Sequence, residues 1–181
     1  MEIKNNPFRL ITVSGASGTG KSLLTKQLAS ILGWPIFSVS SLQRENAKKY
    51  HLSADQIHQL PKSVHQSVDQ QMISTIKRKE NKILESRLCG WQSRNYSDIL
   101  RILCICDSRI SSKRYASREK IPVKKARQEI LDRDKNNLEN YTELYKASDY
   151  LDPKYYQLVI DSSSQTPAQE VEAVIDFIKS K

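Results

Sequence analysis

The chain has 181 residues, of which 38% are hydrophobic and 27% charged, so it holds enough apolar material for one core in a single domain, 1–181. No run of about 18 apolar residues occurs, which excludes a transmembrane helix. No secretory signal opens the chain, and three cysteines cannot form a closed disulfide framework, so we expect a cytoplasmic protein with reduced thiols and no membrane contact. The net charge of +9 suits an anionic partner such as a phosphorylated small molecule. Nucleic acid remains a weaker alternative, because the basic tracts are short.

The first predicted elements are a strand and a helix. Residues 9–14 (RLITVS) are apolar and β-branched and lead into a glycine cluster, which predicts a short buried strand. From 21 to 32, apolar residues recur with helical spacing, and Gly33 is typical of a helix C-terminus. The segment between the two elements is therefore a turn from a strand into a helix.

That turn, residues 15–22, reads GASGTGKS and matches the phosphate-loop motif G-x-x-x-x-G-K-[ST]. Its glycines allow a tight turn whose N–H groups point at an anion, and the following helix adds the positive end of its dipole. Lys21 can reach the β- and γ-phosphates, and Ser22 can bind Mg²⁺. We therefore predict ATP and Mg²⁺ as ligands, with a nucleotide-binding segment made of Gly15, Ala16, Ser17, Gly18, Thr19, Gly20, Lys21, Ser22 and Leu23.

Strands and helices alternate along the rest of the chain. Short apolar runs predict strands at 36–39, 82–84, 99–106 and 158–160, with 99–106 as a central strand. Helices are predicted within 42–79, broken near Pro61, at 108–118, at 123–147, and after Thr166, where Pro167 and Gln169 complete a capping box. This alternation predicts an α/β fold, a three-layer α/β/α P-loop NTPase fold with a parallel five-stranded sheet.

Five arginines follow predicted strands or lie in the charged helices: Arg44, Arg87, Arg114, Arg118 and Arg133. Arg114 and Arg118, four residues apart, share one face of a helix. Phosphoryl transfer depends mainly on positioning and charge neutralisation, and an enzyme that joins two phosphorylated nucleotides must gather many negative charges. The length suits a small phosphotransferase, and no Asn-Lys-x-Asp motif supports a GTPase. An acceptor that is itself a phosphate needs no general base.

Two acidic residues at strand ends are candidates for orienting Mg²⁺ through water. Asp107 ends the apolar run ILCICD, as an acid does in a Walker B strand. Glu85 ends the shorter strand before it, and we favour Glu85 as the functional acid. A surface acid at a strand end is the alternative interpretation of each.

Four stretches of the chain carry the pattern of one known family. They are GASGTGKS at 15–22, SVSSLQRENAKK at 38–49, ILESRLCGW at 83–91, and RDKNNLENY at 133–141 followed by YYQLVIDSS at 155–163. They resemble the phosphate loop and the S-A-G-x-x-x-R, V-x-E-G-R-L-A-G-W, R-E-x-x-N-x-x-R-Y and Y-D-L-V-I-D-T-S segments of the nucleoside monophosphate kinases, and are closest to the archaeal-type cytidylate kinases. The resemblance covers about residues 9–178.

The resemblance implies ATP-dependent transfer of a phosphoryl group to a nucleoside monophosphate, with CMP or dCMP as the acceptor. It implies a helical acceptor-binding insert at 40–80, a lid region at 108–135, and a monomer. The substrate site would be formed by Arg44, Asp69, Glu85 and Arg87. The catalytic residues would be Lys21, Arg114, Arg118 and Arg133.

The chain departs from the family pattern at Ser40, Ser41, Ser86, Ser111 and Asn140. Ser111 and Asn140 stand where arginines are common, and Arg109 or Lys113 are candidates to replace those charges. Two alternatives stay open. One is a P-loop kinase for another small acceptor, for which a hydroxyl would need Glu85 as a base. The other is a catalytically weak nucleotide- or RNA-binding protein, whose affinity for RNA would fall with rising salt.

Overall fold

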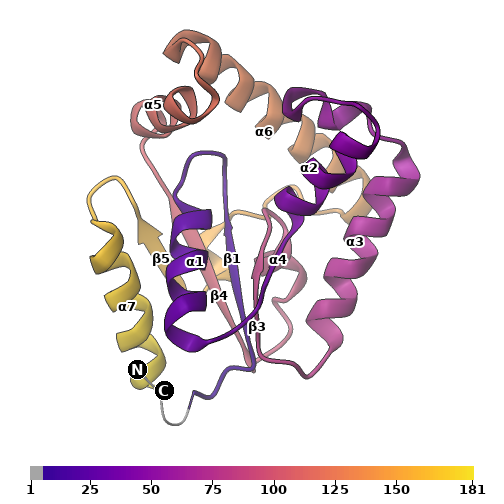
Figure 1. The fold of residues 1–181 in the computed structure, drawn as a ribbon. Helices are drawn as coiled ribbons and strands as arrows, with labels where there is room; N and C mark the ends of the chain where they lie inside the picture. The colour runs from indigo at the N-terminus through magenta and orange to yellow at the C-terminus, as the bar shows by residue number, and fades with distance from the viewer. Residues whose placement is uncertain (1–5) are drawn as a thin grey trace.

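Within residues 6–181, which the computed structural model describes apart from the side chains at 54, 55 and 58, five parallel strands form one sheet (Figure 1). The order is β2-β3-β1-β4-β5, and residues 1–5 of the predicted domain lie outside the described part. The strands are β1 (Leu10–Gly15), β2 (Ile36–Ser38), β3 (Lys82–Glu85), β4 (Ile99–Ile105) and β5 (Leu158–Asp161). All five predicted strands are thus confirmed. β1 holds the middle place, and β4 lies beside it with a partner strand on each side.

The helices and short 3-10 turns are α1 (Lys21–Leu32), α2 (Val39–Lys49), η1 (Ala54–Gln59), α3 (Lys62–Lys77), α4 (Cys89–Gln92), α5 (Ser108–Glu119), α6 (Val123–Tyr145), η2 (Pro153–Tyr155) and α7 (Pro167–Lys179). Gly33 ends α1 in the left-handed conformation, and Thr166 with Gln169 forms the predicted capping box of α7. α2 begins earlier than predicted, because the Ser38 side chain caps it by accepting from the Ser41 amide. α4 and η2 were missed, since so few residues show no periodicity.

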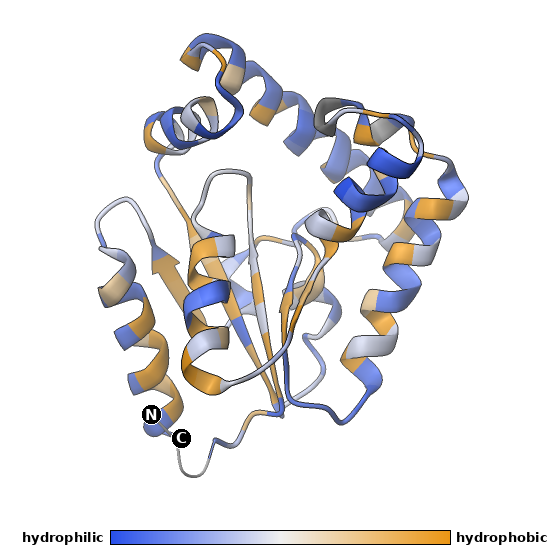
Figure 2. Ribbon diagram, viewed as in Figure 1, coloured by the Kyte–Doolittle hydropathy of each residue, from blue (hydrophilic) through white to orange (hydrophobic). Residues whose placement is uncertain are grey.

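Alternate residues of the inner strands face opposite sides of the sheet, which gives the fold three layers. Ile11 and Val13 of β1 pack with α1 and α7 on one side. Leu10 packs with α3 and α4 on the other side. Figure 2 shows the strands as largely hydrophobic, and the α5, α6 and α2 helices as mostly hydrophilic. The α/β/α prediction is therefore confirmed.

α5 and α6 lie above the carboxyl ends of the strands and pack on each other (Figure 1). Their contact is a small apolar cluster separate from the sheet, formed by Tyr115, Ala116, Ile121, Ala126 and Ile130. Near its C-terminus, α6 also contacts the apolar cluster that Leu10 forms with α3 and α4, through Tyr141 and Tyr145. The two charged helices are consequently held over the phosphate loop.

The cysteines are all free thiols, as predicted, with Cys89 and Cys104 buried and Cys106 half-exposed. In the described part of the chain, no helix combines the length and apolar character needed to cross a membrane.

Candidate active site

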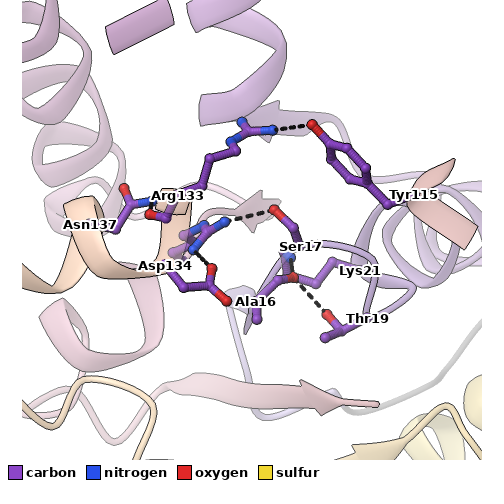
Figure 3. Close-up of polar contacts among 9 residues, drawn as sticks. Ala16, Ser17, Thr19, Lys21, Tyr115, Arg133, Asp134 and Asn137 are labelled. Carbon is purple, nitrogen blue, oxygen red and sulfur yellow. Dashed lines mark hydrogen bonds and ion pairs between the residues drawn. The ribbon is translucent and has the colours of Figure 1, made fainter. Parts of the chain in front are cut away.

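The phosphate loop follows β1 and lies directly against the first turn of α5. Gly18 has a positive φ of 78°, and a Cβ built there would lie 2.6 Å from the carbonyl oxygen of Ser111. Only glycine meets both conditions without strain. The Ala16 carbonyl accepts a hydrogen bond from Thr19 Oγ1 at 3.0 Å and another from Lys21 Nζ (Figure 3). Two side chains of the loop itself therefore hold its backbone in this conformation.

Lys21 carries its charge in a poorly solvated position. Burial lowers its pKa to about 8, and the neighbouring Arg87 guanidinium lowers it as well, while Glu85 acts in the opposite direction. A positive charge that is unfavourable in the ligand-free protein is favoured when an anion sits beside it. The position suits a group that binds phosphate.

Glu85 and Ser22 meet at the same end of the sheet. Ser22 Oγ donates to Glu85 Oε1 at 2.6 Å, and Glu85 is only 6% exposed. A hydroxyl and a carboxylate that both face the phosphate loop fit the oxygen ligands that Mg²⁺ prefers. Asp107 lies elsewhere, because it caps α5 by accepting from the Arg109 amide at 2.8 Å and pairs with the Arg109 side chain. Of the two candidate acids for orienting Mg²⁺, Glu85 is the one that lies beside the phosphate loop.

One cavity of about 900 Å³ opens between the phosphate loop, α2, α3, α5 and α6. Counted over the described residues, its wall holds seven Lys or Arg side chains and four carboxylates, an excess of positive charge. Gly15 and Ala16, the first two residues of the loop, are not among the residues that line the cavity. The other predicted site residues line this cavity together: Ser17, Gly18, Thr19, Gly20, Lys21, Ser22, Leu23, Arg44, Asp69, Glu85, Arg87, Arg114, Arg118 and Arg133.

The arginines of α5 and α6 are engaged with neighbouring side chains. Arg133 Nη1 donates to the Tyr115 hydroxyl at 3.3 Å, which ties α6 to α5 (Figure 3). Arg114 donates to Oγ and to the carbonyl of Ser162, at 2.8 and 2.9 Å. Arg118 pairs with its neighbour Glu119. All three guanidinium groups are therefore restrained at the cavity wall.

The other two arginines of the cavity, Arg87 and Arg44, differ in the contacts that hold them. Arg87 Nη2 donates to Ser17 Oγ at 2.7 Å, and Nη1 donates to Asp134 of α6. Arg44, on α2, is half-buried at the cavity wall and has no ion-pair partner among the described residues. A guanidinium without a carboxylate partner is available to an incoming anion.

Asp69 lies on α3 and accepts a hydrogen bond of 2.6 Å from the Tyr145 hydroxyl of α6. Burial raises the pKa of this carboxyl, while the bond from Tyr145 works against that rise. Asp69 is thus a restrained, partly desolvated carboxyl at the insert end of the cavity.

The two expected replacements for missing arginines are not found in the cavity wall. Arg109 is 88% exposed and pairs with Asp107, and Lys113 is exposed on the outer side of α5. Ser111 is buried under Gly18, and Asn140 lines the cavity. Neither residue is among the described residues that line the cavity, so the suggestion that Arg109 or Lys113 replaces the missing charge stays a prediction.

Several cavity residues were not predicted from the sequence: Gln43, His65, Tyr115, Asn136, Asn137, Tyr141, Pro167 and Glu170. Asn136 and Asn137 lie about one helical turn before Asn140 on α6, and all three follow Arg133. The spacing within the RDKNNLENY motif could therefore have predicted that they share the face of Arg133. Glu170 is buried in the first turn of α7, and its place beside the phosphate loop depends only on the tertiary fold.

Comparison with solved structures shows which class of fold this is. An uncharacterized protein from Eubacterium ventriosum has a TM-score of 0.73 at 17% identity, covering 95% of this chain and 99% of that one. Shikimate kinase from Acinetobacter baumannii has a TM-score of 0.64 at 13% identity, covering 97% and 95%. At such identities the likeness concerns the fold alone, and that fold is the one of the small P-loop kinases.

Comparison of sequences shows the family. The model of the cytidylate kinase-like family matches residues 10–164. Cytidylate kinase of Sulfolobus acidocaldarius is 30% identical over 174 residues, covering 94% of both chains. Cytidylate kinase of Pyrococcus abyssi is 31% identical over 178 residues, covering 95% of this chain and 96% of that one. The chain belongs to the cytidylate kinase-like family, and it is an enzyme, a nucleoside monophosphate kinase that uses ATP.

The desolvated charge of Lys21 predicts a pH-dependent cost to stability. The ordinary pKa of 10.5 holds in the unfolded chain, so the unfolded state binds more protons than the folded one between about pH 8 and 10.5. Within that range stability rises with pH. We therefore expect the free energy of unfolding of Lys21→Ala to gain most, relative to wild type, below pH 8. This gain should shrink as the pH rises toward 10.5.

Urea unfolding of the ligand-free protein at neutral pH and at about pH 10 measures this difference. Lys26→Ala, at an exposed position of the same helix, is the matched control. A gap between wild type and Lys21→Ala that stays constant over the range would contradict the desolvation of Lys21.

Proposed function

We propose that this chain transfers the γ-phosphoryl group of ATP to the phosphate of CMP or dCMP, giving the diphosphate. The observation that carries the proposal is the single cavity in which the phosphate loop faces five arginines. Its volume of about 900 Å³ lies near the upper end of the ~300–1,000 Å³ of ligand pockets, which leaves room for two nucleotides. The cytidylate kinases among the relatives support a cytosine acceptor.

The donor triphosphate would bind at the phosphate loop. The loop's N–H groups and the N-terminus of α1 would hold the β-phosphate, and Lys21 would turn from the Ala16 carbonyl toward the β- and γ-phosphates. The depressed pKa of Lys21 supports this exchange of partners, since an anion restores the charge that burial disfavours.

The acceptor would bind at the insert end of the cavity. Arg44 and Arg87 come from opposite sides, α2 and the turn after β3, and the planar fork of a guanidinium matches the oxygens of a phosphate. Asp69 would face the base or ribose, where a carboxyl can accept a hydrogen bond from an exocyclic amino group. The acceptor phosphate would then lie between Arg87 and the phosphate loop.

In the transfer, an oxygen of the acceptor phosphate attacks the γ-phosphorus, a new P–O bond forms, and the bond to the β,γ-bridging oxygen breaks with its electron pair leaving on ADP. The attacking oxygen is already anionic, so no general base is required. Arg114, Arg118 and Arg133 would neutralise the charge on the transferred group. Closure of the lid, 108–135, would exclude water and limit hydrolysis of ATP. One chain supplies all these groups, which supports a monomer.

Ser22 and Glu85 would hold Mg²⁺, Ser22 directly and Glu85 through water, because their oxygens lie 2.6 Å apart at the loop. When bound there, Mg²⁺ would neutralise part of the charge of the triphosphate. Loss of the Ser22–Glu85 hydrogen bond would free both oxygens for this task.

The test of the proposed function is release of ADP from ATP and Mg²⁺ with each nucleoside monophosphate in turn, and with hydroxyl acceptors. We expect turnover with CMP or dCMP, reduced about 10²–10³-fold or more in Lys21→Ala, because one preorganised donor to the transition state is worth that much. Turnover with a different monophosphate would correct the acceptor. Tight ATP binding without turnover on any acceptor would contradict the proposal.

Arg87→Ala should weaken the acceptor much more than the donor. Arg87 reaches the cavity from the turn after β3, so its loss should raise KM for the monophosphate about tenfold or more and leave KM for ATP nearly unchanged. Arg109→Ala removes an equal charge from an exposed position outside the cavity and is the matched control. Equal increases in both KM values would show that Arg87 is misassigned.

Glu85→Gln should raise the Mg²⁺ concentration needed for half-maximal turnover about tenfold, because the amide keeps the size and the hydrogen bond to Ser22 but loses the negative charge. Binding of Mg²⁺-free ATP should be unchanged or tighter. Titration of Mg²⁺ at saturating ATP and acceptor measures the shift, and an identical Mg²⁺ dependence would remove Glu85 from the metal site.

A further inference from the structure

A line of side-chain contacts joins α6 to the phosphate loop through one guanidinium. Asp134 of α6 accepts from Arg87 Nη1, and Ser17 of the loop accepts from Arg87 Nη2 at 2.7 Å. Figure 3 shows Asp134 and Ser17, each at the end of a dashed line that marks one of these two hydrogen bonds. The three residues come from three different elements, separated by 70 and 47 positions along the chain.

The two partners of Arg87 stand in different relations to the cavity. Ser17 and Arg87 line it, whereas Asp134 lies outside its wall. The side chain of Arg87 is 12% exposed and that of Asp134 is 35% exposed. The carboxylate therefore holds the guanidinium from behind and leaves its cavity face to a ligand.

The ion pair with Asp134 also favours the charged form of Arg87. Burial disfavours the cation, but the Asp134 carboxylate, with smaller contributions from Tyr141 and Tyr150, offsets this, so the pKa of Arg87 lies above its ordinary value. An arginine side chain loses much rotamer entropy when it is fixed. Two partners that already fix it in the ligand-free protein remove most of that cost from the binding step.

We propose that Asp134 is a positioning residue, which holds Arg87 in the orientation that receives the acceptor phosphate beside the phosphate loop. The inference rests on the proposed function, in which Arg87 binds that phosphate. In this proposal Asp134 contacts neither substrate and acts mainly by holding Arg87, with a weaker coulombic effect on Lys21. Its place on α6, next to Arg133, lets the lid and the acceptor site share one anchoring point.

Steady-state kinetics of Asp134→Ala, Asp134→Asn and Asp132→Ala test the proposal, with each substrate varied in turn. We expect Asp134→Ala to raise KM for the monophosphate about tenfold, because a buried cation loses its carboxylate, and to change KM for ATP less than twofold. Asp134→Asn should recover most of the loss, since its amide oxygen still accepts from Nη1. Asp132 is exposed on the same helix, and its one hydrogen-bond partner among the described residues is Gln128, so Asp132→Ala should leave both KM values unchanged. Equal rises in both KM values, or no rise, would overturn the proposal.

A second measurement separates this role from the proposed function. In arginine side-chain NMR spectra, the Nη–H signals of Arg87, assigned by their loss in Arg87→Lys, should be resolved in the ligand-free wild type, because two partners hinder rotation of the guanidinium. They should persist in Asp134→Asn and disappear in Asp134→Ala. If the wild type turns over no monophosphate, the proposed function fails and these spectra still decide the role of Asp134. Unchanged Arg87 signals in Asp134→Ala would overturn it.

Discussion

The crowding of positive charge in one cavity is the constraint on which the rest of the site depends. Seven cationic side chains among the described residues face a space of about 900 Å³, and four carboxylates offset only part of their repulsion. Three of these cations are held by acceptors within the protein: Lys21 by the Ala16 carbonyl, Arg87 by Asp134 and Ser17, and Arg114 by Ser162. These contacts keep the three charged groups oriented at the cavity.

The parallel sheet explains why residues so far apart in sequence meet there. Every strand ends at the same edge, so the loop after β1, Glu85 and Arg87 after β3, and Ser162 after β5 converge by topology alone. α5 then packs its first turn on Gly18, and α6 carries Arg133 and Asp134 over the same edge. The insert helices α2 and α3 complete the wall with Arg44 and Asp69.

Most of this could be predicted from local patterns, and the remainder could not for definite reasons. The strands, α1 with Gly33, the capping box of α7 and the phosphate loop each depend on neighbouring residues, so periodicity and motif suffice. The early start of α2 depends on a Ser38 cap that two further serines, Ser40 and Ser41, made ambiguous, and α4 is too short to show a period. The outward direction of Arg109 and Lys113 and the pairing of Arg87 with Asp134 depend on how α5 and α6 sit on the loop, which no local pattern contains.

The same internal contacts connect stability with function. An internal carboxylate or carbonyl that accepts from a buried cation offsets part of the cost of burying its charge. Burial nevertheless lowers the pKa of Lys21, so its environment still disfavours the charge. An anionic ligand relieves this unfavourable burial, and by linkage a ligand that binds only the folded state stabilises it by an amount that grows with the logarithm of its concentration over its Kd. Donor and acceptor relieve different groups, Lys21 and Arg87, and these two lie close enough for the charge of one to lower the pKa of the other. A monophosphate that neutralises Arg87 would therefore remove one of the two causes that lower the pKa of Lys21, so the lysine would keep its positive charge to a higher pH.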